Sequence, residues 1–255
     1  MFEVRQVPAA AIDEVNRMCL PQGVKEGPAL NAVLRESAAA HARAEAMGAR
    51  VFGAFMERRP VGRIEVMPIE TAPLPLQGED LWVIRCLWVL PPAEGKGIGK
   101  ALMGHALEAA RGSAGVAALT FPGWVPVSFY ARHGFKTVET CGDHVLLLKA
   151  DRPSARVSLV PVKKAQQGSD AVVHVEAVLS ARCPWLILTY RRILDIAREM
   201  SSRVVTAERI IRDRADALSF GEENIYIDGE PLEGALNSDT FRQQLQQKLQ
   251  AKGLL

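Results

Sequence analysis

The chain has 255 residues, of which 48% are hydrophobic and 24% charged, and its formal net charge is +2. This composition excludes a globally disordered chain, and the length leaves room for one large domain or two ordinary ones. The nearly balanced charge lacks the basic footprint of a nucleic-acid-binding protein. No stretch approaches the roughly 18 consecutive apolar residues of a membrane span, so we expect neither nucleic acid nor a membrane as a partner.

The four cysteines, Cys19, Cys86, Cys141 and Cys183, lie far apart in the sequence. No pair has the spacing of a metal-binding knuckle or of a C-x-x-C redox motif, so neither a metal site nor a disulfide framework is expected. Residues 1–5 lack the basic and apolar segments of a secretory signal. These features favour a cytoplasmic protein with reduced thiols.

The first half of the chain is predicted to be mixed α/β. Its longest helix, residues 28–47, is rich in Ala and Glu. Residues 81–90 form a nearly continuous apolar run, as expected for a central strand covered on both faces. Residues 97–111 have the apolar spacing of an amphipathic helix. The other expected elements are helices over residues 9–18 and 127–133, strands over 50–56, 61–67, 116–120, 135–138 and 144–148, a hairpin loop at 57–60 and a loop at 72–78.

A break between domains is expected near residues 151–155, where Pro153 follows an apolar run and cannot continue a strand ladder. Beyond it the predicted order is βαβαββα, the pattern of a small α/β sandwich. Asp228 and Gly229 between two short β-rich runs predict a hairpin turn. The expected elements are strands over residues 171–180 and 203–207, helices over 188–200, 210–217 and 240–249, and a hairpin over 223–232.

A glycine-rich loop links the central strand of the first half to the helix that follows it. Gly95, Gly97 and Gly99 let the backbone turn with positive φ and approach a ligand closely. Amides at a helix start have no intrahelical acceptor, and the helix dipole there favours anions. Lys96 and Lys100 add positive charge. The loop therefore predicts a phosphate cradle.

Two common phosphate motifs do not fit this loop. A P-loop would need glycine at Glu94 and Ser or Thr at Ala101, and a dinucleotide fingerprint would need glycine at Leu102. Residues 95–100 instead resemble motif A of the GNAT superfamily of N-acetyltransferases. A second element of that family, Phe-Tyr-x-x-x-Gly-Phe, is matched about 30 residues downstream by residues 129–135.

The resemblance implies a GNAT acetyltransferase domain over residues 1–152, with a mixed sheet flanked by helices and acetyl-CoA as cosubstrate. It implies direct attack of an amine on the thioester, with Tyr130 as general acid and backbone amides stabilising the developing negative charge. Glu65 is the carboxylate we expect as general base, ahead of Asp80 and Glu79. The implied cofactor-binding residues are Leu87, Trp88 and Val89 beside the thioester, and Gly95, Lys96, Gly97, Ile98, Gly99 and Lys100 around the pyrophosphate.

Two positions depart from the family pattern. The family's Arg or Gln before the glycines is Glu94, and its frequent Asn before the tyrosine is Trp124. The family's acceptor site maps to residues 20–30, which do not identify the acceptor. We therefore expect a small-molecule or peptide amine of unspecified identity, and the resemblance is also compatible with a homodimer.

Residues 157–255 resemble a smaller thioredoxin-like α/β domain, with Cys183 at a strand-to-helix turn where a helix start lowers a thiol pKa. The C-x-x-C resolving position is Leu186, and no proline closely precedes Asn224, so dithiol chemistry is not expected. Cys183 is then a monothiol site or a buried turn residue. Two alternatives to the N-acetyltransferase stay open: a non-catalytic acetyl-CoA-binding or sensing protein, and a thiol-redox module that uses Cys183.

Overall fold

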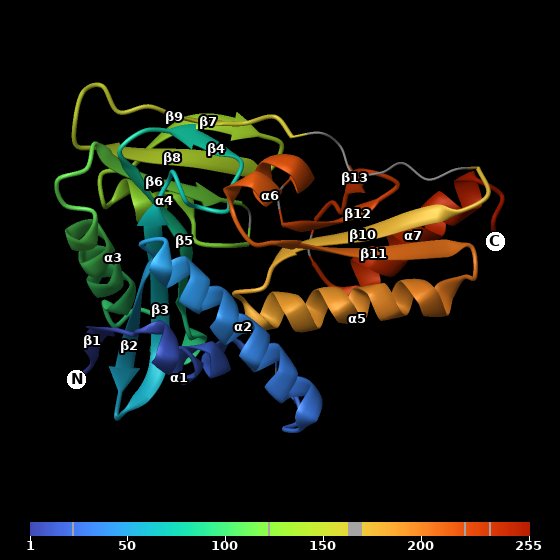
Figure 1. Cartoon of the computed structure of the whole chain (residues 1–255), viewed down its shortest axis with the longest axis horizontal. Coiled ribbons are helices and arrows are strands. Elements are labelled where there is room, and N and C mark those ends of the chain that lie inside the picture. Colours follow the sequence, from blue (N-terminus) through green and yellow to red (C-terminus); the bar gives the residue numbers. More distant parts are fainter. Residues whose placement is uncertain (22, 122, 163–169, 222, 235) are drawn as a thin grey trace. The chain divides into compact units, whose positions relative to one another are not determined.

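The computed structural model describes the chain except at residues 22, 122, 163–169, 222 and 235 (Figure 1). Among the described residues, no helix combines the length and apolarity that crossing a bilayer requires. The elements form two compact units. The first comprises Met1–Glu26, Leu34–Ala72 and Leu76–Val160, and the second comprises Gly27–Val33, Pro73–Pro75 and Pro161–Leu255.

The first unit is built on a seven-stranded mixed sheet in the order β1-β2-β3-β5-β6-β8-β7. Strands β5 and β6 pair in parallel, and the other neighbouring strands pair antiparallel. The strands are β1 (Glu3–Gln6), β2 (Arg50–Met56), β3 (Arg59–Pro68), β5 (Leu81–Val89), β6 (Gly115–Thr120), β7 (Lys136–Cys141) and β8 (His144–Ala150). A separate two-stranded sheet pairs β4 (Leu76–Gly78) with β9 (Val157–Leu159).

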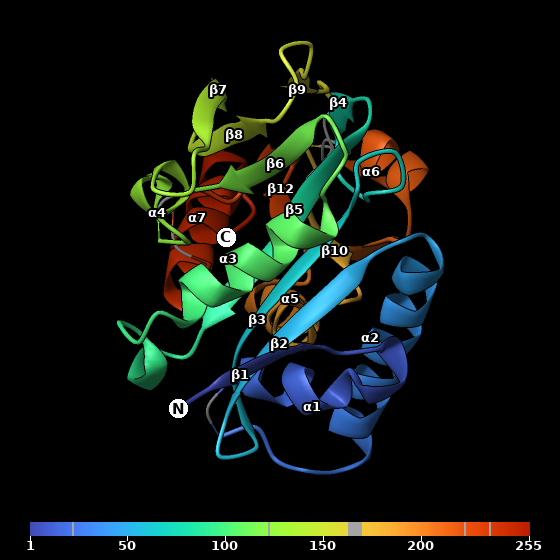
Figure 2. The same ribbon diagram turned by 90° about the vertical axis from the view of Figure 1, so that its left-hand side faces the viewer.

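Helices cover both faces of the seven-stranded sheet. On one face, α3 (Ile98–Ala109) lies across β2, β3 and β5 (Figure 2). There Leu102 packs with Ile64 and Leu87 in the main apolar core. On the other face, Val15 of α1 (Asp13–Asn16) packs with Val51, Phe55 and Ala38, and Ala38 belongs to α2 (Pro28–Ala46). The remaining short helices of this unit are η1 (Ala9–Ala11), η2 (Arg17–Cys19), η3 (Pro91–Ala93) and α4 (Val127–Ala131).

The second unit has a four-stranded sheet in the order β11-β10-β12-β13 (Figure 1). Strand β10 pairs in parallel with β11 and antiparallel with β12, which pairs antiparallel with β13. Helices α5 and α7 contact each other, and α6 packs against β11. The elements are β10 (Val173–Ser180), α5 (Pro184–Met200), β11 (Val204–Ile211), α6 (Arg214–Phe220), β12 (Asn224–Ile227), β13 (Glu230–Pro231) and α7 (Ser238–Ala251).

Several predicted boundaries were wrong. The hairpin loop expected at residues 57–60 contains only Glu57 and Arg58, with φ of 49° and 64°, because both strands continue to the turn. The helix expected at 210–217 begins at Arg214, since β11 extends through Ile211 and the Asp213 side chain then caps the helix. The helix expected at 9–18 is split into η1, α1 and η2.

Short strands occupy two stretches that were expected to lack them. β4 lies within the loop expected at residues 72–78, and β9 follows the break expected at 151–155. Their pairing, Leu76 opposite Leu159, keeps the chain in the first unit as far as Val160. Nearby prolines hid these strands, Pro73 and Pro75 before β4 and Pro153 and Pro161 around β9, because proline limits a strand to edge positions.

Candidate functional site

Strand β5 separates from β6 partway along its length. The parallel pairing ends at Ile84 opposite Ala118, whereas β5 continues to Val89. Its pairing with β3 skips Arg85, which makes a β-bulge, a feature that bends and twists a strand. From Leu87 to Val89, the backbone therefore pairs with β3 on one edge and, within the described residues, with no strand on the β6 edge. Figure 2 shows β6 leaving β5.

The end of β5 leads through η3 into the loop before α3. Gly97 is the N-cap residue of α3 with φ of 80°, and Gly95 has φ of 73°. Residues with a Cβ avoid this left-handed region. A Cβ at either position would meet nothing within 4 Å, so the space beside the loop is open. The amides at the start of α3 lack intrahelical acceptors and lie beside this open space, as an anion site requires.

The lysines beside this loop are placed differently from each other. Lys96 Nζ donates to the Pro92 carbonyl oxygen at 3.1 Å, so this side chain folds back over its own loop. Lys100 acts on His133, which follows the C-cap residue of α4, Arg132. The pKa of His133 is lowered by burial first, and then by the charges of Arg132 and Lys100. Arg132 and His133 were not expected from the sequence to contribute to a site, although both stand inside the matched Phe-Tyr element.

Phe129 joins this loop to α4. A Cβ at Gly99 would lie 3.2 Å from the Phe129 ring, which leaves little room for a larger residue there. The ring of His133 lies 4.8 Å from that of Phe129, centroid to centroid. The start of α3 and the α4 segment are thus packed together, and this packing fixes the position of Tyr130, the next residue.

Tyr130 is 2% exposed. Its ring makes edge-on contacts with Phe129 and Phe135, with centroids 5.7 and 5.4 Å away. Burial raises the pKa of the phenol well above its ordinary value, and the Cys86 thiol on β5 raises it further. The phenol is therefore protonated at neutral pH.

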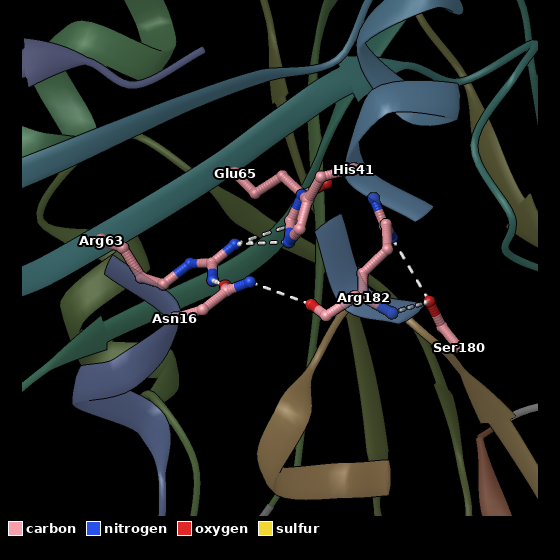
Figure 3. Close-up of polar contacts among 7 residues, drawn as sticks. Asn16, His41, Arg63, Glu65, Ser180 and Arg182 are labelled. Atoms are coloured by element: carbon pink, nitrogen blue, oxygen red, sulfur yellow. Dashed lines mark hydrogen bonds and ion pairs between the residues drawn. The ribbon is translucent and has the colours of Figure 1, made fainter. Parts of the chain in front are cut away.

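Glu65 belongs to a buried polar cluster on the sheet face that α1 and α2 cover (Figure 3). The cluster consists of Asn16, Ser37, His41, Arg63 and Glu65, each at most 3% exposed. Arg63 Nη1 donates to Asn16 Oδ1 at 2.6 Å, and Asn16 Nδ2 donates to Ser37 Oγ at 2.9 Å. Arg63 Nη2 lies 3.5 Å from His41 Nε2 and 3.6 Å from Glu65 Oε2. Arg63 therefore connects the cluster.

Glu65 and Tyr130 are each related to Cys86 on β5. Glu65 is the cross-strand partner of Cys86, so their side chains share one face of the sheet, and the Cys86 thiol raises the pKa of Tyr130. Asp80 and Glu79 instead precede β5, at the end away from the glycine loop. Asp80 Oδ2 there lies 2.6 Å from Arg152 Nη1. Of the three carboxylates considered from sequence, Glu65 is the one beside the bulge.

Three aromatic rings stand where β5 and β6 part. The Trp124 ring stacks on Trp88 with centroids 5.5 Å apart and planes at 16°. Phe121 extends the stack at 6.0 Å and 18°. We call Trp88, Trp124 and Phe121 the aromatic row. Its two loop members were not expected to contribute to a site, and Trp124 stands where the family pattern often has Asn.

Residues 47–137 match the family model described as Acetyltransferase (GNAT) domain. No curated protein matches the sequence. Similar solved structures include PaiA N-acetyltransferase from Thermoplasma acidophilum in complex with coenzyme A, at 20% identity and TM-score 0.44, covering 59% of this chain and 99% of that one. Another is a GNAT family acetyltransferase from Brucella melitensis in complex with acetyl-CoA, at 18% identity and TM-score 0.41, covering 62% of this chain and 95% of that one. A third is the ribosomal-protein-S18-alanine N-acetyltransferase from Escherichia coli, at 11% identity and TM-score 0.44, covering 60% of this chain and 96% of that one.

The matched segment contains the opened edge of β5, the glycine loop before α3 and Tyr130. Residues 47–137 of the first unit therefore match an acetyltransferase (GNAT) domain, that of an acyltransferase with acetyl-CoA as its cosubstrate.

Proposed function

We propose that the protein transfers the acetyl group of acetyl-CoA to an amine by direct attack on the thioester. The observation that carries this proposal is the opened edge of β5, which runs directly into a glycine-rich helix start. Free backbone groups on a strand edge can pair with the amides of the cofactor arm, and a helix start can bind its diphosphate. The proposed cofactor-binding residues are Leu87, Trp88, Val89, Gly95, Lys96, Gly97, Ile98, Gly99 and Lys100.

Tyr130 is proposed to donate its proton to the CoA sulfur as the carbon–sulfur bond breaks. Three features support this role. Burial raises the pKa of the phenol and keeps it protonated, the Cys86 thiol raises that pKa further, and the ring is held by Phe129 and Phe135. A positioned general acid of this kind typically contributes a factor of about 10² to 10⁴ to the rate.

Glu65 is proposed to accept the proton that the attacking amine loses. The guanidinium of Arg63 beside it stabilises a negative charge on the carboxylate. Because Glu65 is buried, the proton reaches it through water. Glu65→Gln should lower kcat more strongly at low pH, where the acceptor is mostly a protonated ammonium, than at high pH, where the free amine is abundant. Equal losses at every pH would remove Glu65 from the proton path.

The proposal is tested by calorimetry with CoA and by thiol release from acetyl-CoA with a panel of amines. Tyr130→Phe should lower kcat by about 10² or more while the Kd of CoA stays unchanged. The matched control is Tyr190→Phe, which alters a buried tyrosine of the second unit and should leave kcat unchanged. Full turnover by Tyr130→Phe contradicts the general-acid role. CoA binding without turnover of any amine favours the sensing alternative.

For the second unit we infer a thioredoxin-like arrangement. Its βαβαββα order and the strand order β11-β10-β12-β13 support it, as does the position of Cys183 at the N-cap of α5. A monothiol role for Cys183 predicts faster alkylation than at the exposed Cys141 near neutral pH, and slower alkylation contradicts it. The four cysteines are thiols and not disulfides, which supports a cytoplasmic location. A small-molecule or peptide acceptor and a homodimeric assembly complete the proposal.

A further inference from the structure

The aromatic row lies on the opposite face of β5 from α3. Leu87 and Val89 pack against the apolar core that α3 shares. Because side chains alternate along a strand, Trp88 between them points to the face of Arg63, its cross-strand partner. In the proposed function the backbone of Trp88 lies beside the thioester. Its ring is then within a side-chain length of the acetyl group, on the side away from the diphosphate loop.

The loop that carries the other two rings is held in place by hydrogen bonds. The Trp124 amide donates to the Phe121 carbonyl oxygen at 3.1 Å, and Thr120 Oγ1 donates to the Val125 carbonyl oxygen at 2.5 Å. Phe121 also meets the His144 ring edge-on, with centroids 5.6 Å apart. The row is therefore arranged before any ligand arrives, which reduces the entropy cost of binding.

The outer end of the row is exposed. Phe121 is 44% exposed, and Val127, at the start of α4, is 37% exposed, which makes them two of the few large apolar side chains so accessible among the described residues. Accessible apolar and aromatic side chains gathered at one place commonly mark a ligand site. The aromatic row thus leads from solvent to Trp88 on β5, two residues from Cys86, the cross-strand partner of Glu65.

We propose that the aromatic row binds the acceptor, and that the acceptor is an arylalkylamine, a primary amine joined to an aromatic ring by a short alkyl linker. This inference rests on the proposed function. The ring of the acceptor would stack along the row, since offset and edge-on aromatic pairs are favourable beyond their buried area. Its amine would then reach the thioester beside Trp88.

The row also suits the chemistry of the attacking group. An amine must be neutral to attack, and apolar surroundings disfavour its charged form. The nitrogen lone pair forms the bond to the acetyl carbon as the carbon–sulfur bond breaks. One proton leaves the nitrogen and one reaches the sulfur, so the products are an N-acetyl arylalkylamine and CoA, with no oxidant or reductant consumed.

The test compares three amines, phenethylamine, cyclohexylethylamine and propylamine, on the full chain with acetyl-CoA. We expect the highest kcat/KM for phenethylamine. Trp124→Ala should lower the ratio of kcat/KM for phenethylamine to that for propylamine by about fivefold to tenfold. Trp124→Phe, which keeps a ring, should recover most of the ratio. The matched control is Val138→Ala, an exposed apolar residue of β7 outside the row, which should leave the ratio unchanged.

Binding is measured separately, by calorimetry of phenethylamine into protein saturated with CoA. The amine should bind, and Trp124→Ala should weaken it while the Kd of CoA stays constant. Equal kcat/KM for phenethylamine and cyclohexylethylamine, or no amine binding, overturns the inference but not the proposed function. A weaker Kd for CoA in Trp124→Ala also overturns it, because the row would then hold the cofactor arm. Failure of CoA itself to bind defeats the proposed function and this inference together.

Discussion

The glycine loop before α3 and the buried polar cluster lie on opposite faces of one sheet and are built in opposite ways. The loop depends on backbone conformation, with φ of 73° at Gly95 and 80° at Gly97. The cluster depends on side chains from separate elements, joined by Arg63. A backbone site should tolerate a changed side chain but not a changed φ. A buried cluster should not tolerate the loss of a charge.

The largest effect is expected from Arg63→Leu. Removing one partner of a buried ion pair takes away much of the compensation of the other charge, which typically costs about 3–5 kcal/mol of stability. We expect a loss of that size in chemical denaturation of the full chain. The double variant Arg63→Leu with Glu65→Leu should recover part of it, since the buried carboxylate is gone.

The control is Arg152→Leu. Arg152 forms a shorter ion pair, 2.6 Å from Asp80, but both side chains are more than half exposed. An exposed pair contributes about 0–1 kcal/mol, so burial and not distance should decide the outcome. If both arginine variants lost the same stability, the cluster would have no special importance for the fold.

The glycine loop could be predicted from the sequence because its determinants are consecutive. Three glycines between an apolar strand and an amphipathic helix suffice to indicate an anion site. The polar cluster could not be predicted, because Asn16, His41 and Arg63 are far apart in sequence. Only the strand register and the packing of α1 and α2 bring them together.

The bulge at Arg85 was hidden for another reason. Trp82 and Ile84 before it, and Leu87 after it, all pack against the core that α3 shares. An extra residue shifts the alternation of side chains by one position, so both halves of β5 bury apolar groups on that face. In the sequence this appears as a continuous apolar run. The strand was therefore predicted correctly, whereas the point where it leaves β6 was not.

The second largest effect, about tenfold on the Kd of CoA, is expected in the glycine loop. Gly97→Ala places a Cβ at φ of 80°, which costs about 1–2 kcal/mol and shifts the amides that would hold the diphosphate. We expect the Kd of CoA to rise about tenfold by calorimetry. Gly104→Ala is the matched control. Its Cβ also meets nothing within 4 Å, but Gly104 lies inside α3, so the change should stabilise the helix by about 0.5–1 kcal/mol. Equal CoA affinity in both variants would refute a backbone cradle.

A smaller effect separates the two lysines of the loop. Lys100→Ala should weaken CoA binding about threefold, because an exposed charge pair contributes at most about 1 kcal/mol. Lys96→Ala should change it less, since Lys96 Nζ is bound to the Pro92 carbonyl oxygen. The Lys100 effect should shrink as salt is added, because ions screen exposed charges. A larger loss in Lys96→Ala would mean that this side chain swings onto the ligand.

The smallest effect, about twofold to threefold on the affinity for CoA, is expected when the pH is changed. Burial, Arg132 and Lys100 lower the pKa of His133 below its ordinary 6.5, so the imidazole is neutral at pH 7. A bound phosphate favours the protonated imidazole, so CoA binding should raise this pKa again and take up a proton below about pH 6.5. CoA affinity should therefore rise as pH falls.

The phosphomonoester of CoA gains a proton near pH 6, which opposes this rise in affinity. The effect of His133 is therefore measured by comparing the unaltered protein with a His133 variant. His133→Gln should bind CoA equally well at about pH 7.5 and less well than the unaltered protein near pH 5.5. Calorimetry in buffers of different ionisation enthalpy measures the proton uptake directly. If both proteins take up the same number of protons, His133 lies outside the phosphate field, and the loop binds its ligand through backbone amides and Lys100 alone.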